Sequence, residues 1–161
     1  ISNDEPRKNV SLIIEAYANL KIDNKWPLKL KLSQSRTIDI PGVELITERL
    51  SDQQISLLYQ QAGAFIFPSI YEGFGLPIVE ALASGCPVIT SNGTACEEVG
   101  KGSVLLVDPY SKEEISAAMI KVMETSDKLS LMIGASDLLA CYSWQTAAEQ
   151  YAQLFKNAAN S

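Results

Sequence analysis

The sequence predicts an α/β fold with a mainly parallel sheet, contained in one domain. Short apolar runs that suit buried strands alternate along the chain with segments in which apolar residues recur at helical spacing. This alternation favours parallel strands joined by helical crossovers. The 161 residues suit one domain with a sizeable core, and no internal repeat or linker divides them.

The first half of the chain predicts the order helix, strand, strand, helix. Apolar residues at helical spacing predict a helix over 9–20. Leucines that alternate with lysines predict a strand over 28–32, and a short apolar run predicts another over 43–46. A capping box that begins at Ser51 predicts a helix to about Ala62.

The connection between the first two strands is short for such a fold. A parallel crossover usually needs about a dozen residues or more, and the segment between 28–32 and 43–46 has too few for a full helix. The sequence therefore predicts either a trimmed crossover or residues missing between Ser33 and Gly42.

The second half continues the alternation of strands and helices, and proline and glycine mark the ends of one helix. Pro77 suits the start of a helix, because its fixed φ matches the helix and its missing N–H would have no partner there. Gly85 suits the end of the same helix. The predicted strands are 64–67, 88–90 and 104–107, and the predicted helices are 77–84, 111–124, about 127–140 and about 144–158.

Composition narrows the class of protein. The net charge of −6 argues against a nucleic acid as partner, because nucleic-acid binding needs a basic face. The absence of histidine excludes a histidine base within these residues. Three cysteines without metal-ligand spacing are typical of reduced thiols in the cytoplasm, and no group of acids predicts a metal site.

The turn before the helix at 77–84 contains the residues that most clearly predict a binding site. Glycines at 73 and 75 let a backbone approach a ligand closely, and the helix start offers free N–H groups and a partial positive charge. This combination suits a phosphate group. Glu72 lies in the turn, and Glu80 lies about one helical turn into the helix, where its carboxylate could hold a vicinal diol.

Two glutamates separated by seven residues around Gly-Phe-Gly-Leu-Pro resemble a known signature. It is the E-x7-E motif of retaining glycosyltransferases with two Rossmann-like lobes, and the similarity is to glycosyltransferase family 4 (glycosyl transferases group 1). The resemblance continues through 81–92 and 105–109 and resumes at 142–144. It implies a Rossmann-like three-layer α/β/α domain, the C-terminal lobe of a GT-B fold, over residues 1–161. It also implies that the first strand and the acceptor-binding N-terminal lobe lie outside these residues.

The same resemblance assigns expected roles to particular residues. Glu72 is the expected catalytic residue, which holds the donor sugar and stabilises the charged transition state, and Glu80 is expected to bind the ribose. Residues at the start of the first helix and in the glycine turn are expected to bind the donor diphosphate and sugar. These residues are Arg7, Lys8, Gly73, Phe74, Gly75 and Leu76.

The residues also permit simpler interpretations. Arg7 and Lys8 could be solvated charges at a helix start, although positive charge is mildly unfavourable there. Glu80 could be a surface acid favoured by the helix dipole, and the ring of Phe74 could simply fill the core. The apolar side chains of the last predicted helix, Trp144, Tyr151, Leu154 and Phe155, could pack within this domain or cross to the other lobe.

The resemblance implies a hexosyltransferase that uses a UDP- or GDP-sugar as substrate, without cofactor or metal, in polysaccharide or glycoconjugate synthesis. The expected acceptor is a sugar or lipid-linked molecule bound by the other lobe, so these residues alone are expected to be inactive. The expected location is the cytoplasm, with possible peripheral membrane association of the full-length protein. The alternatives are a sugar-nucleotide epimerase or phosphorylase of similar shape, and a non-catalytic binding domain.

Overall fold

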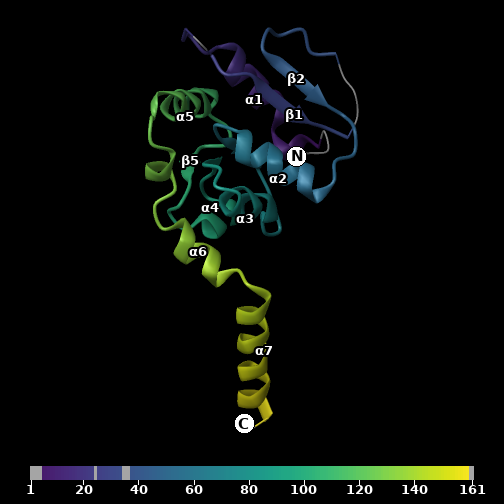
Figure 1. Cartoon of the computed structure of the whole chain (residues 1–161), viewed down its shortest axis with the longest axis vertical. Coiled ribbons are helices and arrows are strands. Elements are labelled where there is room, and N and C mark those ends of the chain that lie inside the picture. The colour runs from purple at the N-terminus through teal and green to yellow at the C-terminus, as the bar shows by residue number, and fades with distance from the viewer. Residues whose placement is uncertain (1–4, 24, 34–36, 160–161) are drawn as a thin grey trace.

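The computed structural model describes residues 5–23, 25–33 and 37–159 and shows an α/β fold (Figure 1). Its strands form two parallel sheets. In the first, β1 (Leu28–Lys31) pairs with β2 (Val43–Ile46). In the second, β4 (Val88–Ser91) lies between β3 (Phe65–Phe67) and β5 (Leu105–Val107). The predicted fold class is confirmed, with the pairing divided between two sheets.

Helices separate the strands along the chain. The capping box predicted at Ser51 is present, because Ser51 Oγ accepts from the N–H of Gln54 and the Gln54 side chain accepts from the N–H of Ser51. The α-helices are α1 (Val10–Ala18), α2 (Asp52–Gln61), α3 (Leu76–Ala83), α4 (Ala95–Gly100), α5 (Lys112–Glu124), α6 (Ala135–Cys141) and α7 (Trp144–Ala159), and the 3-10 helices are η1 (Pro6–Lys8) and η2 (Lys128–Leu131).

The helices form two layers with the strands between them. On one side α1 packs against α5, and Ser116 Oγ donates a hydrogen bond to the carbonyl of Ala16. On the other side α3 packs against α2, α4 and α6. The side chains of β4 supply both cores, because Ile89 belongs to the first cluster and Val88 to the second. All of β4 is buried, which explains its continuous apolar and small residues.

Two elements differ from the predictions. The helix expected at about 127–140 is divided into η2 and α6, because Gly134 adopts a left-handed conformation (φ +80°) and starts α6 anew. The short helix α4 was not predicted, and the Thr94 hydroxyl caps its start. The β1–β2 crossover has no helix in its described residues, 32–33 and 37–42, which agrees with the expectation that it is too short for a full helix.

The last helix leaves the body of the molecule. Figure 1 shows α7 (yellow) extending away from the other elements, and none of its described residues is buried. Trp144 is 93% exposed, and the side chains of Tyr151, Leu154 and Phe155 are also exposed. The apolar face of α7 therefore does not pack within this domain, which contradicts one of the two interpretations open from the sequence.

Candidate functional site

The candidate site lies where β3 ends and α3 begins. Gly75 precedes the first residue of α3 and has φ +105°, a left-handed conformation that favours glycine. The helix begins at Leu76, one residue before the predicted start, and Pro77 is its second residue, where the first turn still tolerates proline. The turn thus presents the free N–H end of an eight-residue helix at the carboxyl edge of the three-stranded sheet.

Gly73 has a different environment from Gly75. A Cβ atom added at Gly73 would meet no atom of the described residues beyond its two chain neighbours within 4 Å, and its φ is not positive. Neither backbone conformation nor packing within the described chain therefore requires glycine at this position. The space beside its backbone is open.

The two basic residues are fixed against this turn by the backbone. Arg7 and Lys8 lie in η1, and the Arg7 carbonyl accepts a hydrogen bond from the N–H of Ile70 at 2.8 Å. The Arg7 guanidinium also donates to the Tyr71 carbonyl at 3.3 Å. The segment that precedes α1 is therefore tied to the loop that follows β3.

Both basic side chains converge on Glu72. Lys8 Nζ lies 2.6 Å from Glu72 Oε1, and Arg7 Nη1 lies 3.1 Å from Glu72 Oε2. The Glu72 and Lys8 side chains are 11% and 13% exposed, so this pair is largely removed from water. Arg7 is more exposed and also pairs with Glu5. The structure brings together three residues that the sequence predicted for one site.

The charges around Glu72 determine its protonation. Partial burial alone would raise the pKa of the Glu72 carboxyl, but the hydrogen bond from Lys8 and the charges of Lys8 and Arg7 outweigh that effect. The pKa of Glu72 therefore lies below its ordinary value, and the carboxylate is ionised at neutral pH.

Asn9 is a site residue that the sequence analysis missed. It adopts a left-handed conformation (φ +61°) between η1 and α1. Its side-chain amide donates to the carbonyls of Pro68 and Pro109, which follow β3 and β5. Asn9 thus holds the start of α1 against the carboxyl ends of two strands. The available signal was the asparagine itself, because Asn tolerates this conformation better than most residues.

Phe74 and Leu76 are placed at the surface of the turn. The Phe74 ring is 43% exposed and contacts Tyr142 edge to face, with ring centroids 5.5 Å apart. Phe74 therefore does not fill the core. The Leu76 side chain is 62% exposed and does not fill the core. Its backbone N–H, at the start of α3, is therefore the group through which Leu76 would contact a ligand.

Glu80 lies in a separate hollow between α2 and α3. The cavity has a volume of about 350 Å³ and is lined by polar side chains that include Asp52, Ser56 and Ser84. The buried Tyr59 lines the same hollow, and burial together with the nearby Glu80 charge raises the pKa of the Tyr59 hydroxyl. Among the described residues, no hydrogen bond or ion pair joins Glu80 to the cluster around Glu72.

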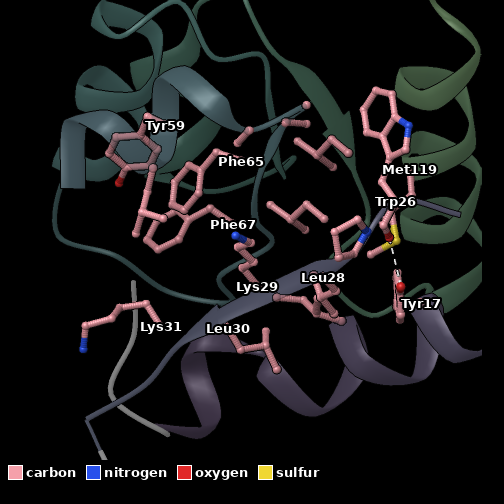
Figure 2. Close-up of a pocket in the computed structure, with 18 of the residues that line it drawn as sticks. Tyr17, Trp26, Leu28, Lys29, Leu30, Lys31, Tyr59, Phe65, Phe67 and Met119 are labelled. Atoms are coloured by element: carbon pink, nitrogen blue, oxygen red, sulfur yellow. Dashed lines mark hydrogen bonds between the residues drawn. The ribbon is translucent and has the colours of Figure 1, made fainter. Parts of the chain in front are cut away.

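Another cavity is lined mostly by apolar side chains and lies away from the turn before α3. It has a volume of about 440 Å³ and lies between β1 and β3 (Figure 2). Lys8 is the predicted site residue that lines it, and the Lys8 ammonium lies 4.8 Å from the centroid of the Phe67 ring. Apolar side chains dominate its lining, which also includes Lys8, Lys29, Lys31 and Lys128.

The fold is that of a Rossmann-like α/β domain. Parallel strands lie between helical layers, and the candidate site lies at the carboxyl ends of the strands, where domains of this class bind ligands. Comparisons with known proteins then identify the family. The profile of the family described as glycosyl transferases group 1 matches residues 39–136, and the chain belongs to this family.

Sequence relatives are mannosyltransferases and related enzymes. The chain is 31% identical to O-antigen chain mannosyltransferase B of Escherichia coli over 97% of this chain and 44% of the relative. It is 30% identical to MMP alpha-(1->4)-mannosyltransferase of Mycolicibacterium hassiacum over 98% of this chain and 42% of that enzyme. The chain therefore spans less than half the length of these relatives.

Solved structures share the fold. Sucrose-phosphate synthase from Thermosynechococcus elongatus superposes with a TM-score of 0.74 at 23% identity, over 98% of this chain and 44% of that chain. Anabaena HepE in complex with UDP-glucose superposes with a TM-score of 0.75 at 20% identity, over 98% and 47%. These similarities support a C-terminal domain of the GT-B fold. In the part of the chain that the structure describes, no helix is long and apolar enough to span a bilayer.

Proposed function

We propose that this chain is the donor-binding lobe of a retaining glycosyltransferase that transfers a hexosyl group from a UDP- or GDP-sugar to an acceptor hydroxyl. Transfer would serve polysaccharide or glycoconjugate synthesis in the cytoplasm or at its membrane surface. The observation that carries this proposal is the convergence of Arg7 and Lys8 on Glu72, beside the start of α3.

Lys8 and Arg7 bind the donor diphosphate in this proposal. Lys8 donates to Glu72, but an ammonium group has three donors, and the Arg7 guanidinium has five. Both groups can therefore bind phosphate oxygens while Glu72 remains close. The backbone N–H groups of residues 73–76 supply further donors at the helix start, and the open space beside Gly73 allows a phosphate to approach them.

The two glutamates hold different parts of the donor. Glu80 binds the ribose diol, and its exposed carboxylate in the polar hollow between α2 and α3 supports that role. Glu72 binds hydroxyl groups of the transferred sugar. Because its lowered pKa keeps it negatively charged, it also stabilises positive charge that develops on the sugar in the transition state.

The proposed reaction exchanges one bond at the anomeric carbon for another. The bond from this carbon to the phosphate oxygen breaks, and the acceptor oxygen forms a new bond on the same face. The acceptor proton passes to the leaving phosphate, so the products are the glycoside and the nucleoside diphosphate. Lys8 and Arg7 stabilise the negative charge that accumulates on the leaving group.

The whole enzyme requires polypeptide outside these residues. The relatives that match nearly all of this chain are more than twice as long, and the acceptor site belongs to their additional length in this proposal. The isolated chain should therefore bind a donor weakly and transfer nothing. The mannosyltransferase relatives favour a mannosyl donor.

Calorimetric titration of residues 1–161 with GDP-mannose and with UDP-glucose tests the donor site. We expect weak binding of at least one donor, weakened roughly tenfold or more by Lys8→Ala or Glu80→Ala through loss of a charge-assisted hydrogen bond. Glu98→Ala, which removes another exposed helical acid, is the matched control and should bind as the unmodified chain does.

Two results would contradict the proposal. One is the absence of binding to every donor, with Glu80→Ala behaving identically. The other is binding that none of these substitutions alters. Efficient transfer by residues 1–161 alone would contradict the assignment of the acceptor site to additional polypeptide.

A further inference from the structure

The backbone of the turn before α3 has few bonds of its own. Among the described residues, no N–H group from 73 to 75 donates a hydrogen bond to another group of the chain. These N–H groups are therefore free for a ligand. Gly73 and Gly75 lie on either side of Phe74, and glycine permits many backbone conformations. A side-chain contact is therefore the means by which this backbone can be held in one conformation.

The ring of Phe74 makes such a contact with the ring of Tyr142, the residue that follows α6. The ring centroids are 5.5 Å apart and the ring planes lie at 87°, an edge-to-face arrangement that aromatic pairs prefer. Within the described part of the chain, no other ring contact reaches the turn. The pair joins the turn to the junction between α6 and α7.

The side chain of Tyr142 is held by contacts that do not involve the turn. Its hydroxyl donates to the Val99 carbonyl at 3.3 Å. Val99 lies near the end of α4, where carbonyls have no partner within the helix. The Tyr142 side chain also packs against the core cluster that contains Val88, and the Lys101 ammonium lies 5.8 Å from the centroid of its ring. The position of this ring is therefore fixed by the body of the domain.

The backbone on both sides of Tyr142 is also fixed. Its N–H donates to the Leu139 carbonyl at 3.0 Å, at the end of α6. The Ser143 hydroxyl accepts from the N–H of Thr146 at 3.0 Å and caps α7, at the point where α7 leaves the body of the molecule (Figure 1). Phe74, by contrast, lies between two glycines. Tyr142 is thus the more constrained member of the pair, so the contact positions the turn.

We propose that Tyr142 is a positioning residue for donor binding. It holds the Phe74 ring, and Phe74 in turn fixes the directions of the N–H groups of residues 73–76. Tyr142 acts through Phe74 and does not touch the donor. This inference rests on the proposed function, because it assumes that these N–H groups bind the donor diphosphate.

Amide relaxation measured by NMR on the donor-free chain of residues 1–161 tests whether Tyr142 holds the turn. Tyr142→Leu removes the ring, and we expect backbone order parameters at Gly73 and Gly75 to fall from about 0.85 toward 0.6 or below. Tyr142→Phe keeps the ring and loses only the hydroxyl bond to Val99, so it should retain the order of the unmodified chain. Phe74→Leu removes the same contact from a partly exposed position and should lower the order as Tyr142→Leu does.

Calorimetric titration with GDP-mannose and with UDP-glucose tests the consequence for binding. An edge-to-face pair changes an equilibrium constant roughly two- to tenfold, so Tyr142→Leu and Phe74→Leu should each weaken donor binding by about that factor. The double variant should bind no more weakly than the weaker single variant, because both substitutions remove one contact. Tyr151→Leu is the matched control, because it breaks the pair with Phe155 on α7 and should leave donor affinity unchanged.

Three results would overturn the positioning role. The first is an unchanged order of Gly73 and Gly75 in both Tyr142→Leu and Phe74→Leu. The second is a double variant in which the two losses of affinity add, and the third is equal weakening by Tyr151→Leu. Absence of donor binding by the unmodified chain would contradict the proposed function instead, and the order parameters would still decide whether Tyr142 holds the turn.

Discussion

Lys8 Nζ lies 2.6 Å from Glu72 Oε1 in a pair that is largely shielded from water, although the two residues are far apart in the sequence. The pair joins the segment before α1 to the turn before α3. Lys8 and Arg7 together hold the pKa of the Glu72 carboxyl below its ordinary value, although partial burial would raise it.

The stability conferred by Glu72 should depend on pH. Because its folded-state pKa lies below the unfolded value of about 4.3, its ion pairs add stability that is fully present above that value and is lost as the pH falls through the folded pKa. Urea denaturation should show Glu72→Gln less stable than the unmodified chain by roughly 1 kcal/mol at pH 7. The difference should shrink near pH 3, and a constant difference would argue against the ion pairs.

The two glycines of the turn should respond differently to alanine. Gly75→Ala places a side chain at φ +105° and should lower the free energy of unfolding by about 1–2 kcal/mol. Gly73→Ala meets no atom of the described residues beyond its chain neighbours within 4 Å and should change the free energy of unfolding by less than about 0.5 kcal/mol. Gly73→Ala should nevertheless weaken donor binding, because the new methyl group occupies the space proposed for phosphate. Donor affinity equal to that of the unmodified chain would place the phosphate elsewhere.

Substitutions of Asn9 should separate backbone strain from hydrogen bonding. Asn9→Gly removes the bonds to Pro68 and Pro109 but accepts the left-handed conformation, whereas Asn9→Ala loses the bonds and adds strain. Chemical denaturation should therefore rank Asn9→Ala below Asn9→Gly by about 1 kcal/mol. Equal stability of the two variants would indicate that residue 9 does not hold this conformation in solution.

The three cysteines should differ in reactivity. Burial raises the pKa of the Cys86 thiol to about 11, and Cys96 is also buried, whereas Cys141 is exposed. Iodoacetamide near neutral pH should therefore modify Cys141 rapidly in the folded chain, and all three thiols only after denaturation. Cys141→Ser should abolish the rapid modification. Rapid labelling of Cys86 in the folded chain would contradict its burial.

Local signals predicted most of the elements. Periodicity and caps located the strands and the start of α2 correctly, because Ser51 and Gln54 satisfy each other's backbone groups whatever the tertiary context. They missed α4, whose six residues are too few to show a clear period. They also joined η2 to α6, because a single glycine at 134 does not by itself distinguish a break from a tolerated residue.

The sequence predicted which residues form the candidate site, but not which of their side chains pair. The turn at 72–76 has a local signature, and the structure places Arg7, Lys8 and Glu72 together as expected. Glu72 pairs with both Arg7 and Lys8 because η1 packs against the loop after β3. Hydrophobic periodicity in the sequence cannot predict this packing. The bonds from Asn9 to two strand ends likewise depend on long-range contacts. The roles of Glu72 and Glu80 toward a donor remain predictions.

The projecting helix α7 has a thermodynamic consequence. Its sixteen residues bury no side chain against the rest of the described chain, and an isolated helix of about that length is only marginally stable in water. On heating, α7 should unwind gradually at temperatures where the two layers are still intact. Loss of helical circular dichroism will therefore begin before loss of core packing, and melting of this chain will not follow a single two-state transition.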